Sequence, residues 1–471
     1  MKIPNIEEII DNNNFKSIDI VNSTLDISKN SLLLIDNKSQ NRLDLLVNEA
    51  LRKKVKKIIT SDICSIEKDE IIKVANYEEI FSLVLSKILP TYMDKNYFGI
   101  TGTNGKTTSG YYLSQMLNNN SLFIGTNENI LFENITNEKH LTTPKIFNIV
   151  KLLSLKENQN VKDVILEVSS HALDQNRLKG IKFKVSGFTN LSQDHLDYHK
   201  NMETYFQSKL KLFSKEISES FVYIDSKWGQ KIKSLTTIPS FSIGTNKNNN
   251  IYIKKINTNK ESFDLTFMLE GLSYDISVPL SGPESHLNYL LALSMAYLSN
   301  IDNFDTLIEK SSNLVNPKGR YEIIKYKNNN DIVIDFAHTP ESIYQVINFS
   351  KRKYKKVHVI LGAGGDRDKD KRILMGKSAN FADKIIVTND NPRNENEEEI
   401  AKDILEGVDL NKDIEVILDR REAIARGIDN LDKDSVLLIL GKGHEKIQEF
   451  KNTSIEFSDQ EEVNKIIEEN L

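Results

Sequence analysis

The chain of 471 residues has a single cysteine, Cys64, which excludes an internal disulfide framework and fits a reducing compartment. It has no apolar run of the roughly 18 to 20 residues that a membrane-spanning helix needs, and its first residues lack the apolar core of a signal peptide. The 62 basic residues are outnumbered by 67 acidic ones, so the basic excess typical of nucleic-acid binding is missing. These absences predict a cytoplasmic protein that binds neither membranes nor nucleic acids.

Arginine is also scarce: it occurs eleven times, and lysine supplies the rest of the basic residues. Its planar guanidinium binds carboxylates and phosphates in a two-point geometry that lysine does not reproduce. A chain with few arginines is expected to keep some of them for that purpose. We therefore give extra weight to Arg177, Arg320, Arg367, Arg372 and Arg393.

Chain length and the alternation of predicted strands and helices indicate three domains of the α/β class. Residues 1–86 hold short strand-like runs and predict a small, shortened N-terminal domain. Residues 87–316 predict a central domain with a mostly parallel sheet and an antiparallel patch near 250–280. Residues 317–471 predict a C-terminal Rossmann-like domain. Because ligands of such sheets bind beyond the carboxyl ends of strands, motifs at strand ends are candidate sites.

The stretch GITGTNGKTTSG, residues 99–110, follows an apolar strand and opens a predicted helix. It departs from the usual P-loop, because Ile100 stands where the first glycine is expected before Gly105-Lys106. Backbone N–H groups of such a loop and the helix N-terminus bind phosphate oxygens. We expect Lys106 to reach the terminal phosphates and the Thr107 hydroxyl to ligate Mg²⁺. The other interpretation is a plain glycine turn before a helix.

Polar residues follow other predicted strands as well. Glu167 ends the strand in VILEVSSH, where it would hold a metal beside the loop or cap a helix. TNLSQDHLDYH places His195 just after a strand, and Lys209 lies ten residues beyond this segment on a predicted helix. GAGGDRDKDKR, DNPR and GKGHE each follow a strand, and each alone is also consistent with a turn. The first of these lacks the third glycine of a dinucleotide fingerprint, so a carboxylate or phosphate ligand suits it better.

Together these motifs resemble the Mur ligases, and among them the branch that adds the third residue of the peptidoglycan stem peptide. The resemblance covers about residues 87–471 and is carried by GTNGKTT, EVSSHALDQNR, TNLSQDHLDYH, GRYE, DFAHTP, GGDRDKDKR, DNPR and GKGHE. The loop G-T-N-G-K-T has the shortened spacing of this family. The resemblance implies an ATP-dependent amide ligase that joins meso-diaminopimelate to UDP-N-acetylmuramoyl-L-Ala-D-Glu through an acyl phosphate.

The resemblance also implies roles for individual residues, each transferred from a matching motif. The nucleotide residues are Gly102, Thr103, Asn104, Gly105, Lys106, Thr107, Thr108, Asn288, Arg320, Asp335 and His338. The residues for the UDP-linked substrate are Thr142, Thr143, Ser169, Gln175, Arg177 and Leu25. The residues for the incoming amino acid are Arg372, Asp390, Asn391, Pro392, Arg393, Gly441 and Glu445.

Catalytic roles are implied for Lys106, Glu167, His195 and Lys209. Two Mg²⁺ are expected, one at Thr107 and Glu167 and the other at His195 and Lys209. Because a cationic lysine cannot ligate a metal, Lys209 is expected to react with CO₂ and become an anionic carbamate (N6-carboxylysine). The expected protein is a monomer that acts on small molecules, namely ATP, the UDP-linked dipeptide precursor and meso-diaminopimelate.

Two segments depart from the family pattern. Where the family has Phe-Asn within G-x-F-N-x-x-N, this chain has Glu284 and Ser285, which predicts a reshaped adenine pocket around Asn288. The N-terminal Leu-Asp-Ser-Arg signature reads Leu-Asp-Ile-Ser at 25–28, and the uridine loop after it is unrecognisable.

Four alternatives remain open. A folylpolyglutamate synthase-like ligase is disfavoured by Thr107-Thr108 and by DNPR, and a P-loop GTPase by the loop spacing. A lysine-adding relative is disfavoured because Arg393 suits a distal carboxylate and Glu445 a distal ammonium, although lanthionine would fit the same pair. A non-catalytic scaffold is suggested by the shortened N-terminal domain and opposed by the four catalytic residues.

Overall fold

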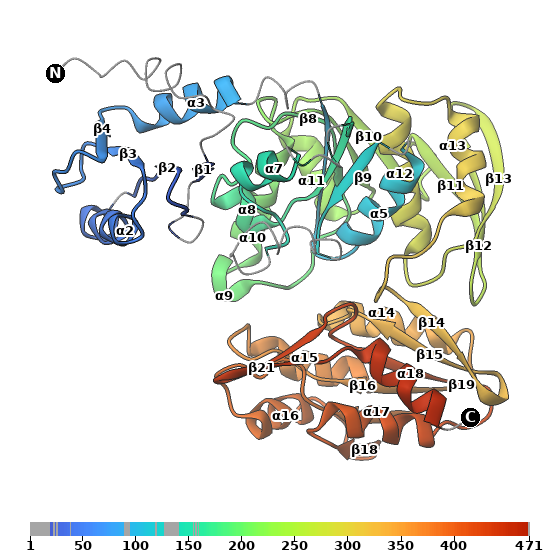
Figure 1. Ribbon diagram of the computed structural model, residues 1–471. Coiled ribbons are helices and arrows are strands. Elements are labelled where there is room, and N and C mark those ends of the chain that lie inside the picture. The colour runs from blue at the N-terminus through green and yellow to red at the C-terminus, as the bar shows by residue number, and fades with distance from the viewer. Residues whose placement is uncertain are drawn as a thin grey trace. The chain divides into compact units, whose positions relative to one another are not determined.

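The structure is a computed structural model of the chain (Figure 1). It describes residues 19–21, 24, 27–37, 39–88, 95–117, 120–126, 141–153, 155, 158 and 160–469. Two compact units divide the chain: one holds the residues up to 98 together with 120–183, and the other holds 99–119 and 184–471. Within the described ranges, no helix is long and apolar enough to cross a bilayer.

The first unit contains a four-stranded parallel sheet with one helix on each face, drawn in blue in Figure 1. Its strands, in spatial order, are β1 (Asp19–Val21), β2 (Ser31–Leu34), β3 (Lys57–Ser61) and β4 (Ile71–Val74). The helices are α2 (Gln40–Arg52) and α3 (Tyr77–Ile88). Leu33 packs in the core under α2, and Leu32 and Leu34 pack under α3, which is the alternation that a strand imposes.

The same unit also holds a second, shorter set of elements. They are β6 (Ser121–Ile124), β7 (Asp163–Glu167), α7 (Ile146–Leu153) and α8 (Ser170–Asp174). Strands β6 and β7 pair in parallel, and every residue of β7 is buried.

The second unit begins with a sheet in the order β13-β12-β11-β10-β9-β8-β5. Its strands are β5 (Asn96–Thr101), β8 (Phe183–Phe188), β9 (Ser218–Ile224), β10 (Ser240–Gly244), β11 (Ile251–Thr258), β12 (Phe263–Leu269) and β13 (Leu272–Val278). β9, β10 and β11 pair in parallel, whereas β11, β12 and β13 form the predicted antiparallel patch. The helices of this part are α5 (Lys106–Met116), α9 (Leu196–His199), α10 (Met202–Leu210), α11 (Lys227–Leu235), α12 (Ser285–Leu298) and α13 (Phe304–Lys310). The mostly buried α12 packs against α5.

The rest of the second unit, drawn in orange and red in Figure 1, contains a six-stranded sheet. The order of its strands is β14-β15-β19-β16-β17-β18. Its strands are β14 (Glu322–Tyr326), β15 (Asn330–Asp335), β16 (Lys356–Leu361), β17 (Lys384–Val387), β18 (Asp413–Val416) and β19 (Ser435–Leu440). Only β14 runs antiparallel to its neighbour. The helices are α14 (Pro340–Lys351), α15 (Asp370–Ala379), α16 (Glu397–Leu405), α17 (Arg420–Asp429) and α18 (Asp459–Glu469), and a hairpin is formed by β20 (Ile447–Phe450) and β21 (Thr453–Glu456). Two separate cores, one under α14 to α16 and one under α17 and α18, explain why the central strands are apolar runs.

The predicted fold class, α/β with mostly parallel sheets, is confirmed. The loop of residues 102–105, called the phosphate loop below, directly follows β5 and precedes α5, as predicted. DFAHTP follows β15, GGDRDKDKR follows β16, DNPR follows β17 and GKGHE follows β19. Because these four strands are parallel neighbours, their motifs gather at one edge of the sheet.

Candidate active site

The phosphate loop between β5 and α5 is held against the segment that follows β8. The backbone N–H of Thr103 donates to the Asn190 carbonyl at 3.0 Å, and Thr103 Oγ1 accepts from the N–H of Ser192 at 3.0 Å. Gly105 has a φ of +82°, and a Cβ at this position would overlap Oδ1 of Asn288 on α12. The loop therefore needs glycine here for both its backbone conformation and its space.

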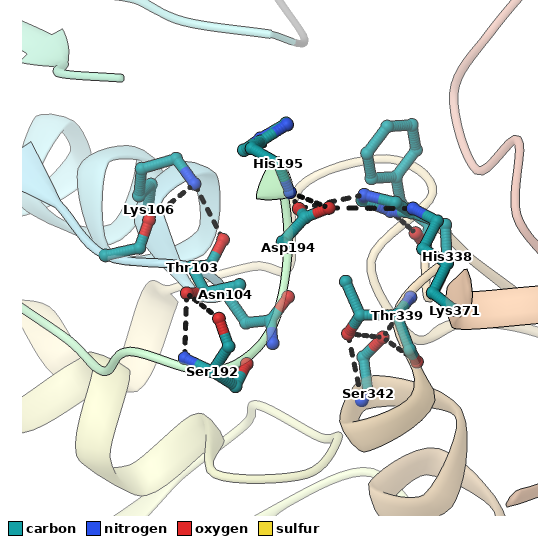
Figure 2. A network of polar contacts seen from close by, with 12 residues as sticks. Thr103, Asn104, Lys106, Ser192, Asp194, His195, His338, Thr339, Ser342 and Lys371 are labelled. Atoms are coloured by element: carbon teal, nitrogen blue, oxygen red, sulfur yellow. Dashed lines mark hydrogen bonds and ion pairs between the residues drawn. The ribbon is translucent and has the colours of Figure 1, made fainter. Parts of the chain in front are cut away.

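Lys106 is folded back onto this loop (Figure 2). Its Nζ donates to the carbonyl of Gly102 at 2.9 Å and to that of Thr103 at 2.7 Å. The residue before α5 is Gly105, which has no side chain to cap the helix. First-turn N–H groups and the adjacent ammonium together make this point suitable for an anion such as phosphate.

A cavity of about 80 Å³ lies beside the loop and gathers most of the predicted nucleotide residues. Its lining includes Asn104, Gly105, Thr108, Asn288, Arg320 and Asp335. Arg320 Nη2 donates to Thr107 Oγ1 at 3.0 Å, and the Arg320 guanidinium lies 4.4 Å from the centre of the Phe336 ring. The Asp335 carboxylate accepts two backbone N–H groups at 2.6 and 2.7 Å. Burial raises the pKa of Asp335, although Arg320 and these donors act against the rise.

Lys209 on α10 points at the start of the same loop. Its side chain is almost fully buried, and Nζ donates to the carbonyl of Gly102 at 2.8 Å. The ammonium also lies 4.7 Å from the centre of the Tyr205 ring. Burial, followed by the nearby charge of Lys106, holds the pKa of Lys209 well below its usual range. A larger share of this amine is therefore neutral, which is the nucleophilic form.

Asp194 joins three of the sequence motifs (Figure 2). Its Oδ2 lies 3.4 Å from Nε2 of His195 and 3.8 Å from Nε2 of His338, and its Oδ1 lies 3.6 Å from Nζ of Lys371. Nδ1 of His338 makes a 2.8 Å hydrogen bond with the Phe336 carbonyl. Burial alone would raise the pKa of Asp194, but the two histidines and Lys371 hold the pKa of this carboxyl well below its usual range.

The DNPR and GKGHE motifs meet through a buried lysine. Lys442 is fully buried, and its Nζ donates to Oδ1 of Asn391 at 3.2 Å, to Oε2 of Glu445 at 3.0 Å and to the Ile447 carbonyl at 2.7 Å. Asn391 Nδ2 also donates to Oε2 of Glu445 at 2.9 Å. Gly441 has a φ of +111°, and its Cα faces the Asp390 carboxylate. The predicted anionic residue Glu445 is thus fixed by both motifs.

The two predicted arginines of this region are held by carboxylates. Arg393, with a φ of +53°, donates from Nε to Oε2 of Glu449 at 2.7 Å and from Nη1 to the Gly365 carbonyl at 2.9 Å. Arg372 is fully buried, and it donates to both carboxylate oxygens of Glu395 at 3.0 Å and to Oδ2 of Asp403 at 2.9 Å. A substrate carboxylate at Arg372 would have to share or displace these partners.

The carbonyl of Pro392 accepts the N–H of Glu395 at 3.1 Å, which closes the DNPR turn. The pKa of Glu395 is lowered to about 2, mainly by its hydrogen bonds with Arg372. The turn that carries Arg393 is therefore tied to the buried arginine of the neighbouring motif.

Arg420 and Asp459 form a fully buried ion pair behind these loops. Arg420 donates from Nε to Oδ1 of Asp459 at 2.7 Å and from Nη2 to Oδ2 at 2.8 Å. Its guanidinium also donates to the carbonyls of Asn389 at 3.2 Å and Leu440 at 3.0 Å, each one residue before DNPR or GKGHE. This pair does not follow from the motifs of the sequence, although Arg420 stands directly after a predicted strand, in the step Asp419-Arg420.

The first unit holds the remaining predicted residues. Glu167 is buried at the end of β7, where its carboxylate accepts from the N–H of Thr126 at 2.7 Å and from its hydroxyl at 3.1 Å. Thr143 Oγ1 donates to the Glu167 carbonyl at 2.7 Å and lies 3.1 Å from Ser169 Oγ. Arg177 donates to Gln175 and to the Thr143 carbonyl at 3.1 Å.

A cavity of about 270 Å³ lies in this unit. It is lined by Tyr77, Phe81, Lys145, Gln175, Asn176, Arg177 and Lys179. Thr142 precedes Thr143 and is partly buried, whereas Leu25 lies outside the described residues. Most residues expected to hold the UDP-linked substrate therefore belong to one unit.

Metal binding has to be judged by the chemistry of the donors. In the described ranges, no group of three or more His, Cys, Asp and Glu side chains is arranged to hold a metal ion. Thr107 in the second unit offers a hydroxyl oxygen, and Glu167 in the first unit offers a carboxylate oxygen. Each is a type of donor that Mg²⁺ accepts together with phosphate and water oxygens. Lys209 as an amine does not suit Mg²⁺, but an anionic carbamate on it would.

Family models match two stretches of the chain. The model of the Mur ligase middle domain matches residues 100–296, and that of the Mur ligase glutamate ligase domain matches residues 319–443.

Three curated relatives named UDP-N-acetylmuramoyl-L-alanyl-D-glutamate–2,6-diaminopimelate ligase illustrate the similarity. The protein of Wigglesworthia glossinidia brevipalpis is 40% identical over 385 residues, covering 79% of this chain and 77% of the relative. That of Aquifex aeolicus is 37% identical with the same coverage. The protein of Rickettsia bellii is 33% identical, and the match covers 97% of this chain and 97% of the relative.

Solved structures of Mur ligases are also similar to this chain. A structure of a ligase with the same name matches with a TM-score of 0.64 and 25% identity, covering 96% of this chain and 94% of that one. MurF ligase from Thermotoga maritima matches with a TM-score of 0.63, covering 97% and 98%, but at 18% identity it shows the fold alone.

Proposed function

Because the chain belongs to the Mur ligase family, we propose that it is the ATP-dependent ligase that adds meso-diaminopimelate to UDP-N-acetylmuramoyl-L-Ala-D-Glu in peptidoglycan synthesis. The observation that carries this proposal is the joining of DNPR and GKGHE by the Asn391–Glu445 hydrogen bond, next to Arg393. This arrangement offers an anion and a cation within one group of loops, as an amino acid with two charged ends requires. The names of the relatives support the same substrate.

The phosphate loop and its cavity support the first step. A carboxylate is a poor electrophile at neutral pH, so its oxygen must first attack the terminal phosphorus of ATP, and ADP leaves. Lys106 and the first turn of α5 would stabilise charge on the phosphoryl oxygens, and Arg320 would contact the nucleotide beside Thr107. In the second step the amine of the amino acid attacks the acyl carbon, loses a proton and releases phosphate.

Lys209 would act as a carbamate. Its neutral amine adds to CO₂, a proton leaves, and an anionic carboxylate forms on Nζ. The lowered pKa of Lys209 supports this reaction because only the neutral amine has a free electron pair. Two Mg²⁺ would neutralise phosphate charge when bound, one held by Thr107 and Glu167 and the other by His195 and the carbamate.

Each substrate would meet its own group of residues. The nucleotide would contact Gly102, Thr103, Asn104, Gly105, Thr108, Asn288, Asp335 and His338 in addition to the residues above. The UDP-linked precursor would contact Thr142, Thr143, Ser169, Gln175, Arg177 and Leu25. The amino acid would contact Arg372, Asp390, Asn391, Pro392, Arg393, Gly441 and Glu445.

We also propose the organisation of the working protein. It is a monomer of three domains, 1–86, 87–316 and 317–471, and it works in the cytoplasm, where ATP and the UDP-linked precursor are available. It acts on small molecules only.

Phosphate release tests the function. The full chain is mixed with ATP, Mg²⁺ and UDP-N-acetylmuramoyl-L-Ala-D-Glu, and meso-diaminopimelate, L-lysine and lanthionine are added one at a time. Phosphate release that needs both the precursor and meso-diaminopimelate is the expected result. Preference for L-lysine would overturn the choice of amino acid, and equal ATP hydrolysis without the precursor would overturn the ligase.

A further inference from the structure

The lining of the cavity beside the phosphate loop also includes Glu284, Gln345 and Val346. Glu284 is the residue before α12, and Gln345 lies on α14. Gln345 Nε2 donates to Oε1 of Glu284 at 3.2 Å, so the two side chains present one oxygen and one amide side by side.

This pair lies away from the phosphates. Asn288 sits directly under Gly105 of the loop, and Glu284 lies one helical turn before it, about 6 Å along the axis of α12. A carboxylate close to the phosphates would be repelled by their charge, whereas the base of a nucleotide is uncharged and is separated from the phosphates by the sugar. The position of the pair therefore fits the base end of the nucleotide.

The surroundings favour a donor as the partner of Glu284. The charged groups near it are Arg320 and Asp335 in the cavity lining and Glu341 on the first turn of α14. Burial, followed by the like charge of Glu341, raises the pKa of Glu284, while Gln345 acts against the rise. A partly buried carboxylate in these surroundings is stabilised by an N–H donor from the ligand.

Adenine and the 6-oxopurines differ at this edge. Adenine presents a 6-amino donor beside the N7 acceptor, whereas guanine presents a 6-oxo acceptor beside N7. Hypoxanthine carries the same 6-oxo group. A carboxylate that accepts and an amide that donates match adenine, and the 6-oxo group would face the carboxylate with two acceptors opposed.

We propose that Glu284 and Gln345 are the specificity-determining residues for the base, with Glu284 accepting from the 6-amino group of adenine and Gln345 donating to the adjacent ring nitrogen. This inference rests on the proposed ATP-dependent function. A missing hydrogen bond to a charged group typically lowers affinity by ten- to a hundredfold. Wild-type protein should therefore bind ADP at least tenfold more tightly than IDP.

Equilibrium binding tests the inference without requiring ligase activity. Calorimetric titrations of the full chain with ADP, IDP and purine riboside diphosphate, in the presence of Mg²⁺, give three dissociation constants for each variant. We expect ADP to bind most tightly and IDP most weakly. Purine riboside diphosphate, which has neither the 6-amino nor the 6-oxo group, should lie between them. If the nucleotides bind in this order but no phosphate release depends on the precursor and meso-diaminopimelate, the ligase proposal fails and the inference about the base stands.

Three variants complete the experiment. Glu284→Gln can donate as well as accept, so the ADP-to-IDP ratio should fall to within about threefold. Gln345→Leu should reduce the same ratio. This variant tests the role of the pair in base recognition even if Glu284→Gln does not fold. Glu309→Gln removes an equal charge from an exposed position on α13, outside the cavity, and should leave the ratio unchanged. Equal binding of ADP and IDP by the wild type, or an unchanged ratio in both cavity variants, would overturn the inference.

Discussion

Two groups of basic side chains in the second unit are held in different ways. At the phosphate loop, Lys106 and Lys209 donate to backbone carbonyls of the loop. At the carboxyl edge of the C-terminal sheet, the cations pair with carboxylates: Arg372 with Glu395, Arg393 with Glu449 and Lys442 with Glu445.

The difference reflects what each group would bind. A neutral carbonyl orients the Lys106 ammonium without cancelling its charge, so Lys106 keeps positive charge for phosphates, whereas Lys209 offers an amine that can form a carbamate. Ion pairs orient both members and leave little net charge at this edge of the sheet, which suits an amino acid that brings charges of both signs. Substitutions in the first group should therefore change the rate of chemistry, and those in the second should change the choice of substrate or the stability.

The largest effect is expected at Lys106. Lys106→Ala removes a cation from developing phosphoryl charge, so kcat should fall by about a thousandfold or more. ADP release with the precursor and meso-diaminopimelate measures it. Lys247→Ala, in an exposed turn, is the matched control and should keep wild-type activity. A Lys106→Ala enzyme within tenfold of the wild type would break the distinction between the two groups.

Lys209 is expected to come next. Lys209→Ala should lose about a hundredfold in activity, and short carboxylic acids should restore part of it by supplying the missing oxygens. Incubation with ¹³C-bicarbonate should give a carbamate signal in the NMR spectrum of the wild type and of the control Lys215→Ala. Unchanged activity in Lys209→Ala, or no carbamate signal in the wild type, would contradict the role given to this lysine.

A smaller effect is expected at Arg393. Arg393→Ala should reduce the preference for meso-diaminopimelate over L-lysine by about tenfold, because only the former has a distal carboxylate to pair. The ratio of the two kcat/KM values measures this preference. Arg352→Ala changes an exposed arginine at the end of α14, outside the motifs, and should leave the ratio unchanged. If Arg393→Ala kept the full preference for meso-diaminopimelate, a residue other than Arg393 would have to bind the distal carboxylate.

The smallest effect at neutral pH is expected at Glu395. Its pKa is lowered to about 2 from the ordinary 4.5, mainly by Arg372, so the ionised form stabilises the fold above about pH 4.5. This stability is lost as the pH falls through the window between 4.5 and 2, by at most about 1.4 kcal/mol per pH unit. Urea unfolding at several pH values should show a shallower pH dependence in Glu395→Gln than in the wild type or Glu398→Gln. Identical slopes in all three would show that the pair with Arg372 does not control acid stability.

Much of the fold followed from local patterns. The glycine loop after an apolar strand, the antiparallel patch near 250–280 and the motifs at the ends of β15, β16, β17 and β19 all appear where the sequence predicted them. The carboxylate partners of the arginines could not be predicted from local patterns, because Glu449 lies 56 residues from Arg393 and Asp459 lies 39 residues from Arg420. Neither carboxylate stands in a motif.

By itself, the sequence determined which local elements form and which chemical groups stand at their ends, since alternation, glycine positions and apolar runs act over a few residues. Only the tertiary structure decided which of those groups meet. Parallel pairing of β15, β19, β16 and β17 brings four distant motifs to one edge, and burial then lowers the pKa of Lys209 and raises that of Glu284. Burial and long-range contacts depend on the packing of the whole unit, which is why no single motif reveals them.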